Sequence, residues 1–390
     1  MASPPAMLAD TAVLDLASVG PAARCTRILA DYGADVVKIG PVSRRAGKQI
    51  RPPYFSYGAG RGLRRAQIDL KAPEGRDALL ALAAKADVFV ESFRPGVAAR
   101  LGLGYEALRA ANPGIVYCST SGYGQDGPYA KWAGHDLNYL ALGGFLACST
   151  PRADGGPPIP GATVADSAAG GMQAAIAILA ALHARTRTGE GAYLDVSVAD
   201  GVLQLMSLHV DEHLATGVEP GPGSGLLTGR LACYDVYQAG DGKWLSVGAI
   251  EPAFYANLCR ALGCERWLEH QHDDGCQDRI RADFAAAFQR KGRDAWIAEL
   301  APADTCVAPV YRVSELVDDP HYRARGAFVE AHERDHGSFR QTGAVLAGAR
   351  RDLPPYEVPD AGHTDTDTVL REAGVPDATI RSLRASGAVE

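Results

Sequence analysis

The sequence predicts an α/β protein with a large doubly wound parallel-sheet domain and a smaller α+β domain. Three observations support this prediction: short apolar runs alternate with helical segments over residues 10–120, a Pro/Gly-rich segment follows at 217–225, and a hairpin-like pair of apolar segments comes after it. A chain of 390 residues is also long enough for two domains.

The first domain opens with a βαβ unit, in which Pro21 stands at the first position of the first helix. Because short buried strands joined by helices pair in parallel, we expect one parallel sheet. The expected strands are 13–18, 34–39, 67–70, 86–90 and 114–118, and the expected helices between them are 21–32, 73–85 and one that ends near residue 111.

The rest of the chain continues the pattern and then changes it. A long Ala/Gly-rich helix is expected at 163–182, a strand at 192–197 and a helix at 198–215. The second domain is expected to hold a hairpin of 232–237 and 243–248 and helices at 252–262, 278–290 and 293–300. The predicted division is a large domain at 1–216 completed by 340–390, a linker at 217–230, a small domain at 231–325, and a C-terminal part at 326–390 with an extended strap near 353–360 and helices at 364–373 and 376–386.

Composition narrows the function classes. Hydrophobic residues make up 47% of the chain but are broken everywhere by charge, so we expect no transmembrane helix and no membrane partner. The N-terminal residues show no basic or apolar region of a secretory signal, so the cytoplasm is the expected location. The net charge of -7 argues against a nucleic-acid partner. The eight scattered cysteines lack Cys-x-x-Cys spacing and are expected to be reduced core residues.

One local stretch is basic in this acidic chain. It is either a solvated loop or a site for an anionic, phosphate-bearing ligand at the edge of an open sheet. Nicotinamide and ATP sites are disfavoured, because neither Gly-x-Gly-x-x-Gly after a strand nor a P-loop occurs. Asp69 is the one acid among the basic residues Arg44, Arg45, Lys48, Arg51, Arg61, Arg64, Arg65 and Lys71.

The segment from His209 to His213 matches the His-x-x-Glu-His pattern of one metallopeptidase class. No third ligand is identifiable, so an amphipathic helix with a solvated face is favoured over a metal site. The polar residues 270–274 are interpreted as a loop. We therefore predict no metal.

The candidates for proton chemistry are a histidine and isolated carboxylates near helix starts. His135 and Asp136 follow Gly134, Asp166 precedes a helix, and Glu251 stands before a proline. A helix start presents unpaired N–H groups that hold an oxyanion. The alternative for each residue is a structural one, because aspartate is a good helix cap and a neighbouring histidine is then simply exposed.

Taken together, these positions resemble the family III CoA-transferase superfamily of the CaiB/BaiF type, and within it the α-methylacyl-CoA racemase branch. The resemblance covers nearly the whole chain. The stretches that carry it include Leu29-Ala-Asp-Tyr-Gly-Ala-Asp35, Phe93-Arg-Pro-Gly96, Ala133-Gly-His-Asp-Leu-Asn-Tyr139, Val164-Ala-Asp166 and Val247-Gly-Ala-Ile-Glu251.

The resemblance implies that His135 and Asp166 exchange protons on opposite sides of the substrate α-carbon, and that Glu251 orients His135. It implies that the backbone at Asp136 holds the enolate oxygen. It also implies an interlocked homodimer, in which Glu251 reaches His135 of the other chain, and no cofactor, because coenzyme A is part of the substrate. The implied CoA-binding residues are Lys38, Ile68, Asp69, Leu70, Lys71, Arg94, Gly134, Leu137, Asn138 and Tyr139.

Two departures from the racemase pattern lie at the implied acyl pocket. Thr228 and Arg230 stand in a stretch that usually reads Leu-Asp-Gly-Gly, and Ser167 stands where the racemases usually carry an aromatic residue. Arg230 either meets a polar acyl group or pairs with a surface acid.

Three functions follow as alternatives. The first is an acyl-CoA racemase or epimerase. The second is a CoA-transferase that forms an acyl anhydride on Asp166, and the third is a CoA-binding protein without activity.

Overall fold

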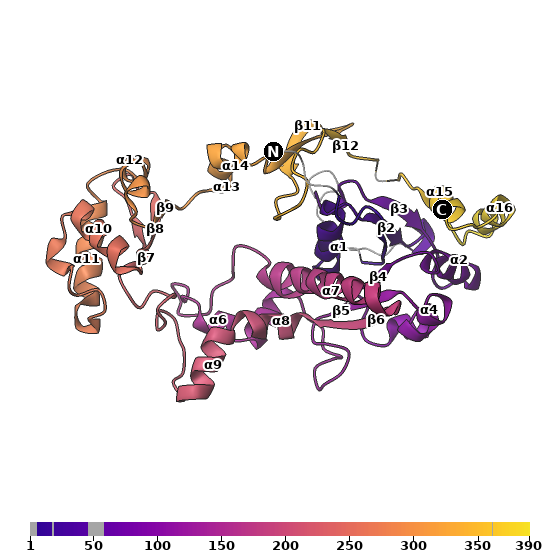
Figure 1. Ribbon diagram of the computed structural model, residues 1–390, viewed down its shortest axis with the longest axis horizontal. Coiled ribbons are helices and arrows are strands. Elements are labelled where there is room, and N and C mark those ends of the chain that lie inside the picture. Colours follow the sequence, from indigo (N-terminus) through magenta and orange to yellow (C-terminus); the bar gives the residue numbers. More distant parts are fainter. Residues whose placement is uncertain (1–5, 18, 46–57, 361) are drawn as a thin grey trace. The chain divides into compact units, whose positions relative to one another are not determined.

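The computed structural model describes residues 6–17, 19–45, 58–360 and 362–390, and the chain divides into two compact units (Figure 1). The first comprises Met1–Gly143, Pro160–Ser207 and His321–Glu390, and the second Gly144–Ile159 and Leu208–Pro320. The second unit therefore takes in the residues predicted as a linker and begins earlier than the predicted range of 231–325.

The first unit is built on a six-stranded parallel sheet of order β3-β2-β1-β4-β5-β6, which confirms the predicted parallel sheet. The chain runs from β1 to β2 and β3 and then crosses back to β4 on the other side of β1, so the strand order reverses there. The strands are β1 (Ala12–Asp15), β2 (Asp35–Gly40), β3 (Arg64–Gln67), β4 (Val88–Glu91), β5 (Val116–Ser121) and β6 (Ala192–Ser197).

Helices cover both faces of this sheet, because successive strand residues point to opposite sides. Val13 and Val88 pack with α1 and α7 on one face, whereas Leu14 and Phe89 pack with α2, α4, α15 and α16 on the other. Figure 1 shows where these helices lie along the sheet. The helices are α1 (Pro21–Asp31), α2 (Pro73–Ala83), α3 (Val97–Arg100), α4 (Tyr105–Ala111), α5 (Asp136–Leu142), α7 (Gln173–Thr188), α8 (Val198–Leu205), α15 (Thr366–Glu372) and α16 (Asp377–Ala385).

The predicted strand at 67–70 is wrong in position. The strand β3 consists of Arg64–Gln67, and Ile68 instead forms an isolated bridge with Val389. Charged residues hid this edge strand, because Arg64 pairs with Asp35 and Glu372 rather than pointing into a core. The C-terminal part also holds a hairpin that the sequence did not predict, formed by β10 (Phe328–Glu333) and β11 (Gly337–Thr342) and joined by β12 (Tyr356–Glu357).

The second unit has a small antiparallel sheet of order β7-β8-β9, formed by β7 (Tyr234–Gln238), β8 (Trp244–Gly248) and β9 (Val307–Pro309). Its core contains the large side chains of Tyr255, Phe284, Phe288 and Trp296. The remaining helices are α6 (Phe145–Cys148), α9 (Ser207–Thr216), α10 (Pro252–Leu262), α11 (Gln277–Phe288), α12 (Arg293–Leu300), α13 (Val313–Leu316) and α14 (Pro320–Ala324), the last at the boundary of the two units.

A π-helix, η4 (Ala165–Met172), runs directly into α7 and forms a continuous helix from Ala165 to Thr188. Among the described residues it is the one helix long and apolar enough to cross a membrane, with 24 residues and an 18-residue window of mean hydropathy 1.4. This helix meets the criterion by length and composition alone, so the expectation of no transmembrane helix stays a prediction. Core helices of soluble proteins meet the same criterion, and this helix packs against α1 and α8, so it is weak evidence for a membrane span.

The glycine at position 201 lets α8 approach η4 closely. A Cβ atom at Gly201 would stand 2.0 Å from the carbonyl oxygen of Ala169. We expect Gly201→Ala to lower the free energy of unfolding by about 1–3 kcal/mol, because the clash with backbone outweighs the higher helix propensity of alanine.

The matched control is Gly161→Ala, since a Cβ atom at Gly161 would meet no atom within 4 Å. Chemical denaturation followed by circular dichroism should show a change within about 0.5 kcal/mol for this control. Equal stabilities of the two variants would contradict the close approach of α8 and η4.

Candidate active site

A cavity of about 860 Å³ opens at the carboxyl-terminal edge of the parallel sheet. Its walls come from the segments that follow β1, β4 and β5, which is where open α/β sheets place ligands. His135 and Asp166, which lie on different segments of the chain, line this same cavity. The other lining residues include Val19, Gly20, Arg24, Phe93, Arg94, Gly122, Trp132, Gly134, Asn138 and Tyr139.

Tyr139 fixes the loop that carries His135. The Tyr139 hydroxyl donates a hydrogen bond of 2.6 Å to the carbonyl of Gly134, and its ring fits between two glycines. A Cβ atom at Gly122 or Gly134 would stand 2.5 Å or 2.7 Å from the Tyr139 ring. Burial is the main cause that raises the pKa of Tyr139 to about 12, so the phenol remains a hydrogen-bond donor at neutral pH.

His135 stands directly before α5. The side-chain oxygen of Asn138 accepts a hydrogen bond of 3.0 Å from the His135 backbone N–H, which fixes the first turn. The imidazole is exposed and lines the cavity. The ring is therefore available to a substrate in the cavity.

Asp136 connects the two candidate catalytic segments. Its Oδ1 accepts a hydrogen bond of 2.8 Å from the backbone N–H of Asp166. The sequence suggested a backbone role or a helix cap for Asp136, whereas its side chain ties the start of α5 to the start of η4. A side chain that acts in this way positions the candidate acid and base relative to each other.

Asp166 lies in the first turn of η4, a kind of helix that often occurs at functional sites. Burial raises the pKa of this half-buried carboxyl above its usual value, and the negative charge of Asp136 adds to the effect. The positive charges of Arg24 and His135 act in the opposite direction. A carboxyl with a raised pKa is better suited to exchange protons near neutral pH.

Two further glycines let α1 support Asp166 from the other side. A Cβ atom at Gly170 would stand 2.5 Å from the Cβ of Pro21, and one at Gly171 would stand 2.8 Å from the Cβ of Arg24. The helices α1 and η4 therefore pack closely against each other.

Sequence reasoning missed Asp15, which organises the turn after β1. This fully buried carboxylate accepts hydrogen bonds from the backbone N–H of Ala17 (2.7 Å), the hydroxyl of Thr26 (2.7 Å) and the ammonium of Lys38 (2.8 Å). An aspartate inside an apolar strand was the available signal, because a buried charge requires such partners.

The residues implied in CoA binding lie in different environments. Lys38 pairs with Asp15, and Asp69 is buried and pairs with Arg44 and Arg45. Ile68 is in the core, and Leu70 is only partly buried and packs against it. Lys71 and Leu137 are exposed, whereas Arg94, Gly134, Asn138 and Tyr139 line the cavity with His135.

Ion pairs account for much of the basic stretch. Arg61 pairs with Asp31, and Arg64 pairs with two acids. Lys48 and Arg51 lie outside the described residues.

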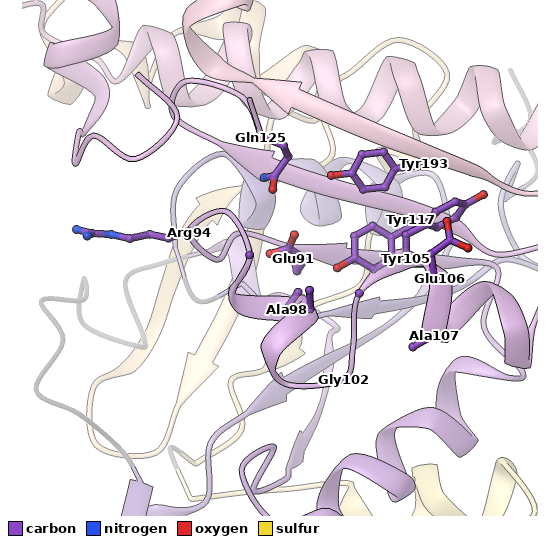
Figure 2. Close-up of a pocket in the computed structure, with 13 residues that line it drawn as sticks. Glu91, Arg94, Ala98, Gly102, Tyr105, Glu106, Ala107, Tyr117, Gln125 and Tyr193 are labelled. Atoms are coloured by element: carbon purple, nitrogen blue, oxygen red, sulfur yellow. The ribbon is translucent and has the colours of Figure 1, made fainter. Parts of the chain in front are cut away.

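Arg94 also lines a second cavity, of about 520 Å³. Figure 2 shows the rings of Tyr105, Tyr117 and Tyr193 grouped together, with Arg94 extending away from them. The ring centroids of Tyr105 and Tyr193 are 5.4 Å apart. Glu91, which also lines this cavity, accepts hydrogen bonds from the Ser119 hydroxyl and from the backbone N–H of Phe93 (2.7 Å) and so fixes the turn that carries Arg94.

The third predicted catalytic residue belongs to the second unit. Glu251 is exposed and directly precedes α10. Arg230, also in this unit, pairs with Asp274 at 3.1 Å, and the Thr228 hydroxyl accepts a hydrogen bond from the backbone N–H of Gly225. The arginine that sequence reasoning suggested for the acyl group thus has a carboxylate partner of its own.

One group of possible metal ligands occurs within the part of the chain that the structure describes. The ligand atoms of His270, Asp273 and Cys276, in the second unit, lie within 4.8 Å of one another. The Asp273 carboxylate accepts a hydrogen bond from the Cys276 thiol at 3.0 Å and lies 3.3 Å from Nδ1 of His270. These contacts explain the cluster as a hydrogen-bonded turn.

Comparison with known proteins agrees with this architecture. The model of CoA-transferase family III matches residues 8–364. Human α-methylacyl-CoA racemase is 36% identical over 384 residues, which cover 98% of this chain and 97% of that protein. The succinyl-CoA–D-citramalate CoA-transferase of Chloroflexus aurantiacus is 31% identical over 359 residues, which cover 88% of each chain.

A crystal structure of a CaiB/BaiF family protein from Brucella suis superposes with a TM-score of 0.75 at 25% sequence identity. The superposition covers 96% of this chain and 100% of that chain. With a family match over most of its length and relatives that span nearly all of it, this chain is an enzyme of CoA-transferase family III.

Proposed function

We propose that this enzyme is an acyl-CoA racemase or epimerase that interconverts the stereoisomers of 2-methyl or similarly α-substituted acyl-CoA thioesters. The observation that carries the proposal is that His135 and Asp166 line one cavity. The racemases among the relatives, at 36% and 34% identity over nearly the whole chain, favour the same reaction.

The chemistry is a 1,1-proton transfer. One of the two residues takes the proton from the α-carbon, and the electron pair of the C–H bond passes to the thioester oxygen to give an enolate. The other residue then donates a proton to the opposite face of the α-carbon, which inverts the configuration. In the reverse direction the two residues exchange roles, so one must be a base when the other is an acid.

The site supplies what each step requires. A histidine has an ordinary pKa of about 6.5 and both takes and gives protons near neutral pH, whereas Asp166 needs the raised pKa that burial and Asp136 provide. The first backbone N–H groups of α5, beginning at Asp136, are the proposed donors to the enolate oxygen. No cofactor takes part in this scheme, because coenzyme A belongs to the substrate.

The proposal includes the CoA site and the assembly. Arg94 lies between the active-site cavity and the tyrosine-lined cavity, and its guanidinium suits stacking against a purine. The exposed Lys71 is the proposed contact to phosphate. We assign Glu251 to the active site of a second copy of the chain in an interlocked homodimer, where it would orient the partner's His135.

A CoA-transferase is the second candidate. In that reaction the carboxylate of Asp166 attacks the thioester carbonyl, and the CoA thiolate leaves as an acyl anhydride forms. Ser167 and the transferases among the relatives favour this alternative. The two candidates differ in their need for His135, which only the racemase uses to move the α-proton.

The first test of the racemase is deuterium uptake at the α-carbon of a 2-methylacyl-CoA in deuterium oxide. We expect His135→Ala and Asp166→Asn each to lower racemisation by roughly 10²–10⁴-fold, because each removes one of two acid/base groups. Each variant keeps one of the two residues, so it should still exchange the α-proton of one enantiomer. His135→Ala and Asp166→Asn should act on opposite enantiomers. Mass spectrometry of the separated enantiomers measures both effects.

The control for that test is His183→Ala, since His183 is an exposed histidine on α7 outside the cavity, and it should racemise at the wild-type rate. The transferase would be supported instead if the wild type took up no deuterium, hydroxylamine trapped an acyl group on Asp166, and His135→Ala still transferred CoA.

The second test concerns the Asp136 side chain as a positioning group. Asp136→Asn keeps an oxygen acceptor for the Asp166 N–H but removes the negative charge that helps raise the pKa of Asp166. Asp166 acts as a base only when ionised, so the rate for the enantiomer that it deprotonates falls as pH drops through its pKa. We therefore expect Asp136→Asn to move this acid limb to lower pH.

Asp136→Ala removes the acceptor as well and should lower kcat by roughly 10–100-fold, because Asp166 is no longer held in place. The measurement is the pH dependence of kcat/KM for each enantiomer separately. An unchanged acid limb in Asp136→Asn would contradict the electrostatic role of this side chain.

A further inference from the structure

A third cavity, of about 550 Å³, adjoins the active site. Arg24 lines both cavities, and Ser167, the residue after Asp166, lines only this one. The two cavities therefore meet beside a proposed catalytic carboxylate. The polar and apolar residues that define the third cavity include Arg24, Arg27, Asp31, Arg61, Ser167 and Met172.

This cavity has an excess of positive charge. Asp31 is the one acid among its described lining residues, and it pairs with both Arg27 (2.8 Å) and Arg61 (2.6 Å). Arg61 also donates to the carbonyl of Thr342 at 2.6 Å, so it is held in place. The single carboxylate of Asp31 is therefore shared by two guanidinium groups, and Arg24 adds a third positive charge to the cavity.

Arg24 has no carboxylate partner among the described residues. Its Nη2 donates a hydrogen bond of 2.6 Å to the hydroxyl of Thr163, while its Nε is buried without any partner. The Nε of Arg27, in the same cavity, is also buried and unpaired. Buried N–H groups of arginine normally have acceptors, so the guanidinium of Arg24, which lines the cavity, is only partly satisfied by the described residues.

We infer that the acyl group of the substrate ends in a carboxylate, which Arg24 and the Ser167 hydroxyl bind in this cavity. The inference rests on the proposed function, because that function places the α-carbon between His135 and Asp166. From there Arg24 and Ser167 are the adjacent polar groups on the side of Asp166. A planar guanidinium matches a carboxylate with two parallel hydrogen bonds, which a hydrocarbon end cannot use.

The other arginine considered for this role is unsuited to it. Arg230 already pairs with Asp274, whereas Arg24 has a guanidinium edge without an acceptor. A phosphate of coenzyme A is the other anion with matching chemistry. It differs from an acyl carboxylate in one testable respect, since every CoA thioester carries it.

The experiment compares two CoA thioesters that differ only at the end of the acyl chain. They are 2-methylpentanoyl-CoA and 2-methylglutaryl-CoA with the thioester next to the branched carbon. Deuterium uptake gives kcat/KM for each, and titration calorimetry gives the affinity of each without need of turnover. We expect the wild type to prefer the carboxylate substrate in both measurements.

Arg24→Gln should lower the carboxylate-to-methyl ratio of kcat/KM, and of affinity, by roughly 10–100-fold, as expected for loss of a charge-assisted hydrogen-bond pair. Arg24→Lys should retain part of the preference for the carboxylate substrate, because lysine keeps the positive charge but lacks the planar set of N–H donors that matches a carboxylate. Ser167→Ala should reduce the same ratio by a smaller factor and provides a second variant if Arg24→Gln does not fold. The control is Arg109→Gln, an exposed arginine on α4, which should leave the ratio unchanged.

The outcomes separate this inference from the proposed function. The inference would be overturned if both substrates exchanged with no preference for the carboxylate, or if the carboxylate-to-methyl ratio of kcat/KM were unaffected by Arg24→Gln and Ser167→Ala. Either result would still support the proposed racemase. Tighter binding of the carboxylate substrate that depends on Arg24, without any exchange, would support the ligand class and overturn the racemase. An equal loss of affinity for both thioesters and for free CoA would show that Arg24 binds a CoA phosphate, and would also overturn the inference.

Discussion

The hydrogen bond from the Asp166 backbone N–H to the Asp136 carboxylate is the contact on which the proposed chemistry depends, because it joins the segment of the histidine to the segment of the carboxylate. A hydrogen bond to a charged group contributes about 1.5–3 kcal/mol. That amount holds two segments in register only where the surrounding backbone is already close. The glycines at 170, 171 and 201 fix η4, the helix that carries Asp166, closely against α1 and α8, because each lacks a Cβ atom that would collide with a neighbouring helix.

The packing of η4 and the contact with Asp136 determine the proton affinity of Asp166 as well as its position. A carboxyl placed in the Ala/Gly-rich start of η4 loses hydration, and a second carboxylate within hydrogen-bond reach of its backbone adds a like charge. Both effects favour the protonated form of Asp166. In the proposed reaction, the scaffold that places Asp166 and His135 at one cavity therefore also adjusts Asp166 for proton transfer in both directions.

Local sequence patterns were sufficient for most of the fold and for the site residues as candidates. Strand and helix periodicity predicted the parallel sheet, and His135, Asp136 and Asp166 stood out at helix starts. The sequence could not show contacts that depend on tertiary packing, such as the side-chain role of Asp136 or the three partners of Asp15. It also misplaced β3, since an edge strand held by ion pairs lacks the apolar pattern that marks a buried strand. Arg24 escaped notice because it lies in α1, outside the basic stretch.

The balance of charges around Asp166 connects proton transfer with the choice of substrate. Arg24 opposes the rise in the pKa of Asp166 that burial and Asp136 produce. An anion bound to Arg24 offsets that positive charge, so Asp166 then experiences burial and Asp136 with less opposition. A neutral acyl chain in the same place leaves Arg24 uncompensated. The residue proposed to recognise the acyl group therefore also affects the proton affinity of Asp166, the proposed catalytic carboxyl, because its positive charge acts on both groups.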